Sequence, residues 1–149
     1  DWLVFLDADL SFHPGHIERL LAAQRESDAD CVLGSPFSAE GTEVPWPRRL
    51  PSLLLNAFYR GLLDRGLSAF TPMFRLYRGS ALRELRLSSD GFEISVEILA
   101  LLLRAGRRVR EIPVPLTTRL TGESKLRRWR ELANHFRLIL RLLARPHRV

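Results

Sequence analysis

The sequence contains a single cysteine and no long apolar run. One cysteine, Cys31, excludes an internal disulfide framework, and its apolar neighbours favour a small core residue. No uninterrupted apolar run approaches the roughly 20 residues that span a bilayer. Because an acid at position 1 opens the chain on a strand pattern, we expect no secretory signal. The 149 residues, 46% of them hydrophobic, suffice for one domain with a sizeable core and are too apolar for disorder.

Positive charge is concentrated in the last third of the chain. Residues 1–103 contain 10 Lys/Arg and 14 Asp/Glu, whereas residues 104–149 contain 13 and 3, within a net charge of +6. This basic segment indicates an anionic partner, which could be nucleic acid, acidic lipid headgroups or a phosphate-bearing substrate. Composition does not choose among them.

Strand and helix patterns alternate along the chain. Residues 2–6, WLVFL, predict a strand buried on both faces inside a parallel sheet, and a helix from Pro14 and a strand at 30–34 follow. This order is typical of an α/β fold. Residues 35–51 are rich in Pro, Gly and Ser and predict a long loop. The other expected elements are helices at 52–66, 79–85, 88–106 and 129–144 and strands at 73–77 and 107–116.

Two acids, Asp7 and Asp9, follow the first predicted strand. Ligands of open α/β sheets bind beyond the carboxyl ends of strands, and strand alternation would put both carboxylates on one side. Two hard oxygen ligands suit Mg²⁺ or Mn²⁺, which would bring a diphosphate with it. The alternative is a pair of solvated loop aspartates that cap the next helix.

The chain resembles the family-2 glycosyltransferases, and within them the polyprenyl-phosphate (dolichol-phosphate) mannosyltransferases. The resemblance runs from Asp1 to about Leu143 and is carried by FLDADLSFHP, FRLYRGSAL, GFEISVEILALLLRAG, REIPVPL and RLTGESKL, in this order. It implies an α/β fold in which residues 1–149 form a single domain, the C-terminal two-thirds of a Rossmann-like GT-A catalytic domain. A mixed sheet would be flanked by helices, with an amphipathic helix at 127–145. The family's earlier strands, which hold base and ribose, are absent, so we expect either a fragment or a protein without a nucleoside pocket.

The resemblance also implies an activity. It is the inverting, metal-dependent transfer of mannose or a similar hexose from a nucleotide-sugar to a polyprenyl (dolichyl) phosphate. The protein would lie peripherally on the cytoplasmic face of a membrane and use Mg²⁺ or Mn²⁺. A non-catalytic membrane-surface adaptor on a truncated transferase fold remains the alternative. A nucleic-acid-binding module ranks last, because aromatic residues are not interleaved with the basic cluster.

The resemblance assigns site residues to the first half of the chain and to the helix at 88–106. Asp7 and Asp9 would bind the nucleotide-sugar and, with Ser11, the metal. Arg75 and Glu97 are expected, with Asp9, in the catalytic centre. A buried arginine needs an anionic partner, so Arg75 would meet a substrate phosphate or an internal carboxylate. For Glu97 the alternative is an acid paired with an arginine and without a chemical role.

The acceptor phosphate would be bound by four further residues, namely Arg49, Arg119, Ser124 and Lys125. A hydroxyl, an ammonium and main-chain N–H groups in a turn can together hold an oxyanion. The alternatives are a basic surface loop and, for Arg49, a solvated charge. Three positions depart from the family pattern: Pro36 replaces an arginine, and Ala69 and Thr118 replace acids.

The last predicted helix has an apolar stripe beside arginines. The stripe comprises Leu132, Phe136, Ile139, Leu140 and Leu143, and the flanking residues are Arg130, Arg137, Arg141 and Arg145. This pattern is typical of a helix in a membrane interface, and equally of a surface helix packed on a core. The family resemblance favours the interface.

Overall fold

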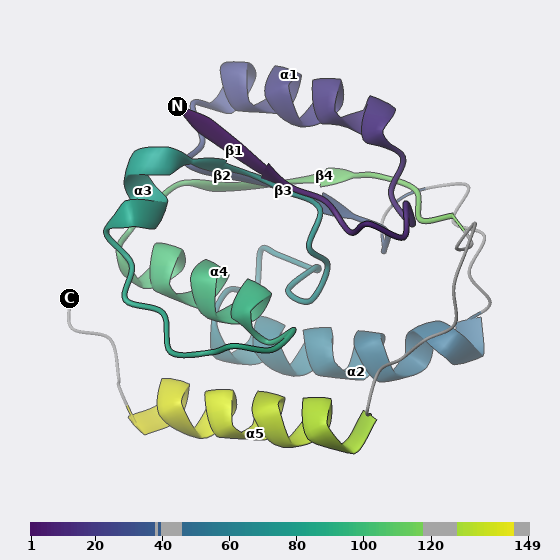
Figure 1. The fold of residues 1–149 in the computed structure, drawn as a ribbon, viewed down its shortest axis with the longest axis vertical. Coiled ribbons are helices and arrows are strands. Elements are labelled where there is room, and N and C mark those ends of the chain that lie inside the picture. Colours follow the sequence, from purple (N-terminus) through teal and green to yellow (C-terminus); the bar gives the residue numbers. More distant parts are fainter. Residues whose placement is uncertain (38, 40–45, 118–127, 145–149) are drawn as a thin grey trace.

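The structure, a computed structural model, describes residues 1–37, 39, 46–117 and 128–144, without the side chains of 46–49 and 128. A four-stranded sheet lies between helices (Figure 1). In chain order the elements are β1 (Trp2–Phe5), the 3₁₀ helix η1 (Pro14–His16), α1 (Ile17–Ser27), β2 (Cys31–Ser35), α2 (Trp46–Leu62), β3 (Arg75–Arg78), α3 (Gly79–Arg83), α4 (Ile94–Arg104), β4 (Val109–Pro113) and α5 (Arg128–Ala144).

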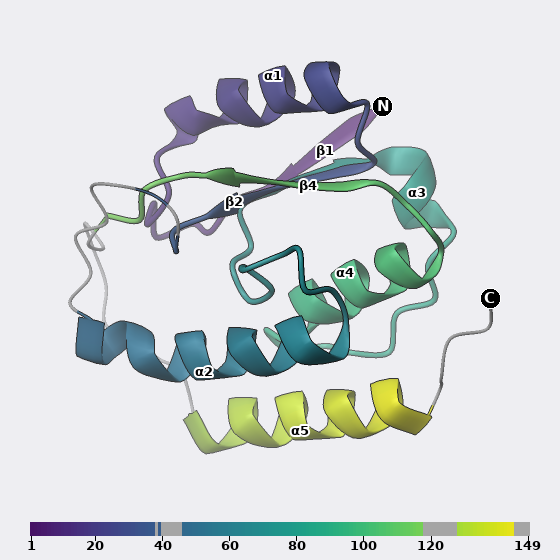
Figure 2. The ribbon, with the colours of Figure 1, turned by 180° about the vertical axis from the view of Figure 1, so that it is seen from behind.

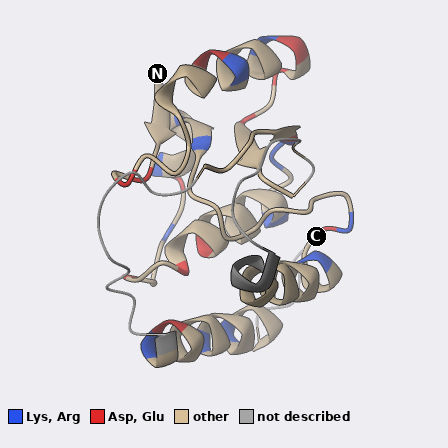
Figure 3. Cartoon of the chain, turned by 90° about the vertical axis from the view of Figure 1, so that its right-hand side faces the viewer, with Lys and Arg blue, Asp and Glu red and all other residues tan. Residues whose placement is uncertain are grey.

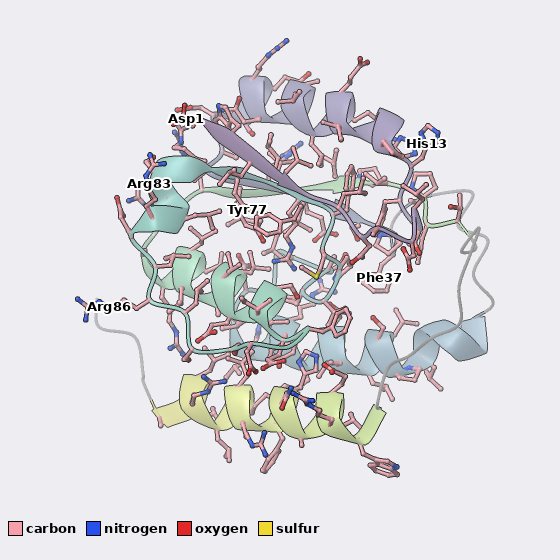
Figure 4. All side chains as sticks on the ribbon, in the orientation of Figure 1. Asp1, His13, Phe37, Tyr77, Arg83 and Arg86 are labelled. Atoms are coloured by element: carbon pink, nitrogen blue, oxygen red, sulfur yellow. The ribbon has the colours of Figure 1, made fainter. Side chains whose placement is uncertain are left out.

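The sheet is mixed, as predicted, with the strand order β1-β3-β2-β4. β3 is antiparallel to β1 and to β2, whereas β2 and β4 are parallel. The carboxyl ends of β1, β2 and β4 therefore meet the start of β3 at one edge of the sheet. We call this the carboxyl edge, made of residues 6–11, 36–37, 68–74 and 114–117. The opposite, amino edge contains Asp1, 28–30, Arg78 and 107–108. His13 and Phe37 lie toward the carboxyl edge and Asp1 toward the amino edge (Figure 4).

The prediction that the first strand is buried inside a parallel sheet was wrong. β1 is an outer strand that pairs antiparallel with β3. Its side chains Leu3, Val4 and Phe5 are 48%, 38% and 38% exposed. A continuous apolar run predicts a strand, but it does not say which neighbours that strand will have.

Helices cover both faces of the sheet. α1 packs on one face through a core that includes Leu20, Val32 and Leu76. On the other face α4 and α2 lie beneath the sheet, and α5 lies beside α2, farthest from α1 (Figures 1 and 2). Leu138 and Leu142 of α5 join the core on this face. Cys31 is fully buried, as expected, and burial raises the pKa of its thiol to about 12.

Two helix starts differ from their predicted positions. α2 begins at Trp46 rather than at 52 and contains Pro51, so the predicted loop at 35–51 is too long. Pro47 falls in the first turn, where a missing N–H costs little, and Pro51 removes only one main-chain hydrogen bond of the helix, so these prolines were poor signs of a loop. α4 begins at Ile94 rather than at 88, because the main-chain N–H groups of Ser88 and Ser89 donate to the Glu97 carboxylate instead.

Candidate functional site at the carboxyl edge

The two acids after β1 lie in a turn. The Leu10 N–H donates to the Asp7 carbonyl at 3.2 Å, and both Asp7 and Asp9 are half-buried. Leu10 has a φ of 56°, in the left-handed region that leucine seldom adopts. Strand alternation therefore does not orient the two carboxylates, contrary to the argument from sequence. Both acids instead belong to the one tight turn that the hydrogen bond from Leu10 to Asp7 closes.

Hydrogen bonds connect Asp9 to Ser11, and Ser11 to the chain that leaves β4. One carboxylate oxygen of Asp9 accepts from the Ser11 N–H at 3.1 Å and from the Ser11 hydroxyl at 2.7 Å. The Ser11 carbonyl accepts from the Thr117 N–H at 3.0 Å and from the Thr117 hydroxyl at 3.2 Å. Segments about one hundred residues apart in sequence thus meet at the acidic turn.

The donor atoms of the acidic turn suit a hard divalent cation. Asp7, Asp9 and Ser11 offer oxygen only, as Mg²⁺ and Mn²⁺ prefer. Within the described residues no group of three or more His, Cys, Asp or Glu side chains could hold a metal by itself. Mg²⁺ is commonly bound by one or two carboxylates together with substrate phosphates and water. The residues present therefore fit a cation that shares its coordination with a diphosphate.

Two residues that sequence reasoning missed hold the segment before β3. Glu111 of β4 accepts from the N–H groups of Ser68 at 2.7 Å and Ala69 at 3.2 Å. Asn56 of α2 accepts from the N–H groups of Phe70 and Thr71. Two features of the sequence could have revealed these residues, namely an asparagine on an apolar helix face and a glutamate inside a strand. Together Glu111 and Asn56 fix the backbone of residues 68–71 against β4 and α2.

Arg75 is fully buried at the start of β3. Its guanidinium donates to the carbonyls of Ser95 and Phe70 at 2.5 Å each, and to the Tyr77 hydroxyl at 3.2 Å. These acceptors are neutral oxygens, whereas the sequence argument expected a phosphate or a carboxylate. In this structure Arg75 joins the carboxyl edge to the start of α4.

Glu97 lies in the first turn of α4 and is 6% exposed. Its carboxylate accepts from the N–H groups of Ser88 and Ser89 and from the Ser88 hydroxyl, at 2.6–3.2 Å. Burial raises the pKa of Glu97, but these hydrogen bonds outweigh it and leave the pKa below its ordinary value. Arg141 of α5 approaches the same carboxylate at 3.8 Å. Glu97 thus anchors the 88–89 segment and faces α5.

The expected acceptor-phosphate residues cannot be compared with this geometry. Arg119, Ser124 and Lys125 lie outside the described residues, and so does the Arg49 side chain, although Arg49 itself belongs to α2. The described residue that precedes Arg119, Ser124 and Lys125 most closely in the sequence is Thr117, which lies at the acidic turn. Their role stays a prediction.

α2 and α5 leave apolar side chains uncovered. The two helices lie side by side (Figure 3), and a buried hydrogen bond of 2.9 Å joins the Tyr59 hydroxyl to His135 Nδ1. Of the predicted α5 stripe, Ile139 is half-buried whereas four residues are at least half exposed. The exposed residues on both helices are Leu50, Leu53, Leu54, Phe58, Trp129, Leu132, Phe136, Leu140 and Leu143. None of the helices in the described part combines the length and apolarity that crossing a bilayer requires.

Comparisons with known proteins find similarity to one family. The family model described as glycosyl transferase family 2 matches residues 1–86. The chain is 36% identical over 131 residues to the undecaprenyl-phosphate mannosyltransferase of Micrococcus luteus, a match covering 85% of this chain and 53% of that protein. It is 34% identical over 129 residues to the polyprenol monophosphomannose synthase of Mycolicibacterium smegmatis, covering 83% and 48% respectively. The chain thus spans about half the length of these relatives.

Proposed function

Because the chain belongs to glycosyl transferase family 2, we propose that it acts in the transfer of a sugar from a nucleotide-sugar to a polyprenyl phosphate. The names of both relatives support mannose or a similar hexose and a polyprenyl acceptor. Since the chain spans about half of their length, the proposal concerns the protein at the length of its relatives.

The observation that carries the proposal is the bond between Ser11 and Thr117. It holds the end of the segment after β4 against the acidic turn. The chain that leaves β4 therefore returns to the acidic turn at Thr117. This contact supports an arrangement in which cation-bound diphosphate and acceptor phosphate meet in one place, with Arg119, Ser124 and Lys125, which follow Thr117 in the sequence, proposed for the acceptor side.

The chemistry we propose is a direct displacement with inversion. An oxygen of the acceptor phosphate attacks the anomeric carbon, and the nucleoside diphosphate leaves from the opposite side. Because a phosphate monoester is already ionised near neutral pH, no strong general base is required, and positioning dominates. A bound Mg²⁺ or Mn²⁺ would neutralise charge on the leaving diphosphate. Asp7 and Asp9 would bind it. Arg75 would act as a positioning residue through the Phe70 and Ser95 carbonyls, whereas Glu97 would hold the 88–89 segment at α5 and act on the site only through α4.

The exposed apolar side chains of α2 and α5 support a peripheral membrane contact. Several large apolar side chains exposed on neighbouring helices commonly mark an interaction site, and a polyprenyl acceptor resides in a bilayer. Arginines on α5 suit the phosphates of lipid headgroups. Such a contact would bring the acceptor phosphate to the carboxyl edge.

The test is a transfer assay on the protein at its full encoded length. Purified protein is incubated with a panel of nucleotide-sugars, a detergent-dispersed polyprenyl phosphate and Mn²⁺. We expect one sugar to be transferred with inversion, and chelation of the cation to stop the reaction. Binding to anionic vesicles without any nucleotide-sugar binding would instead support the non-catalytic adaptor.

A further inference from the structure

A pocket that the proposed reaction does not use lies between residues 88–93 and α5. Its volume is about 450 Å³, within the range of small-ligand sites. It is lined by Asp90, Glu93, Asn134, Arg137, Leu140 and Arg141, among others. Carboxylates come from the segment before α4 and guanidinium groups come from α5, so its two walls carry opposite charges.

Glu93 is the buried polar group of this pocket. It is 3% exposed, and its Oε2 receives no hydrogen bond from the part of the chain that the structure describes. The pocket is tight here, because a Cβ at Gly91 would lie 2.5 Å from Glu93 Oε2 and 2.8 Å from the Asn134 side-chain nitrogen. A buried carboxylate oxygen without a donor is costly. The terminal torsion of a glutamate is soft, so a ligand donor in the pocket could satisfy this oxygen.

The arginines of one wall do not form ion pairs with the carboxylates of the other. Among the described residues, Arg141 pairs with Glu97 at 3.8 Å and donates to the serines at 88 and 89. Arg137 donates to the Asn134 side-chain oxygen at 3.1 Å. Neither arginine forms an ion pair with Asp90 or Glu93 within the described part of the chain. A simple anion or a simple cation would meet one wall of its own sign, whereas a zwitterion would complement both.

The pocket also borders the exposed apolar stripe of α5. Leu140 lines it and is 50% exposed, beside Phe136 and Leu143 of the same stripe. A group bound here therefore lies where α5 changes from apolar to charged, which is the depth of lipid headgroups for a helix in the membrane interface. This step rests on the membrane contact in the proposed function.

We propose that this pocket binds the phosphoethanolamine headgroup of a bilayer lipid. The primary ammonium donates hydrogen bonds to Glu93 and Asp90, and the phosphate accepts from Arg137 and Arg141. A trimethylammonium headgroup has no N–H to donate and leaves Glu93 unsatisfied. The protein would thus distinguish two lipids of equal net charge.

The experiment is co-sedimentation of the protein with two sets of vesicles. Both contain the same share of phosphatidylglycerol, and the remaining lipid is either phosphatidylethanolamine or phosphatidylcholine. We expect about tenfold tighter binding to the ethanolamine set, as for one added charge-assisted hydrogen bond. Glu93→Gln should abolish the preference, and Asp90→Asn, which removes the other carboxylate that accepts from the ammonium, should reduce it. Glu26→Gln, an exposed glutamate on α1 far from α5, should keep it.

Equal binding of the wild-type protein to both vesicle sets overturns the headgroup site, and so does a preference that is unchanged in Asp90→Asn. Asp90 is exposed, so this variant is expected to fold even if Glu93→Gln does not. Absence of binding to any vesicle overturns the membrane contact as well. The transfer assay in detergent contains no bilayer, so its outcome reports on the proposed reaction independently.

Discussion

The two edges of the sheet use acidic residues in different ways. At the amino edge Asp28 and Asp30 form ion pairs with Arg78 at 3.0 and 2.8 Å, and Asp28 also pairs with Arg108. Toward the carboxyl edge, Asp9 in the acidic turn and Glu111 within β4 accept hydrogen bonds from main-chain N–H groups and serine hydroxyls. The first arrangement joins strand ends. The second shapes the loops that surround a candidate site.

The amino-edge pairs of Asp28 are solvent-exposed, which limits what they contribute, whereas the Asp30 side chain is only 13% exposed. The Asp28 side chain is 65% exposed. Hydrogen bonds from Arg108 and then Arg78 lower the pKa of its carboxyl. Exposed ion pairs typically stabilise a fold by no more than about 1 kcal/mol. We therefore expect changes at the carboxyl edge to dominate both activity and stability.

The largest expected effect is on turnover. Asp9→Asn removes a carboxylate from the acidic turn, so cation-dependent sugar transfer by the full-length protein should fall at least about 100-fold. Steady-state rates with the sugar identified in the transfer assay measure this loss. Asp28→Asn makes the same chemical change at the amino edge and should leave the rate within about twofold of wild type. Similar losses in both variants would contradict the difference between the edges.

The next effect is on stability and compares the two ends of β3. Arg75→Met leaves the carbonyls of Phe70 and Ser95 without their donor, so we expect a loss of about 2–5 kcal/mol in the free energy of unfolding. Arg78→Met breaks an exposed pair with Asp28 and a half-buried pair with Asp30, whose carboxylate still accepts from the Arg108 main-chain N–H, so it should cost less than Arg75→Met. Denaturant unfolding of both variants measures the difference. Equal losses would mean that Arg78, which also lies over the Trp2 ring at 4.9 Å, contributes as a buried residue does.

A smaller effect concerns the pH dependence of stability. Glu97 has a folded-state pKa below its ordinary value of 4.5, so the stability that it contributes is present above that value and lost as pH falls through the folded pKa. Glu97→Gln should therefore be less stable than wild type near neutral pH. The difference in stability between the two proteins should narrow below about pH 4.5. Thermal melts between neutral and acid pH test this, with the exposed Glu26→Gln as the control. A difference that stays constant with pH would show that the effect is not electrostatic.

Apolar periodicity predicted the α/β class, and the family resemblance, carried by motifs local to the chain, predicted the mixed sheet. Sequence reasoning failed where the outcome depends on distant partners. The exposure of β1 depends on strand order, and the partners of Arg75 depend on how the 70–71 segment meets α4. Asn56 and Glu111 escaped notice for the same reason, since their hydrogen bonds reach residues 14 or more positions away. The acidic turn was found because its residues are adjacent in sequence.

The smallest expected effect tests the bond that joins the acidic turn to the chain after β4. Thr117→Val keeps the N–H donor to Ser11 and removes only the hydroxyl donor at 3.2 Å. One neutral hydrogen bond is worth about 1 kcal/mol, so the KM for the polyprenyl phosphate should rise no more than about fivefold. The KM for the nucleotide-sugar should change less, because Asp7 and Asp9 are untouched. Thr117→Ser retains a hydroxyl and should restore the wild-type value. If the two KM values rise together in Thr117→Val, Thr117 supports the whole site rather than its acceptor side.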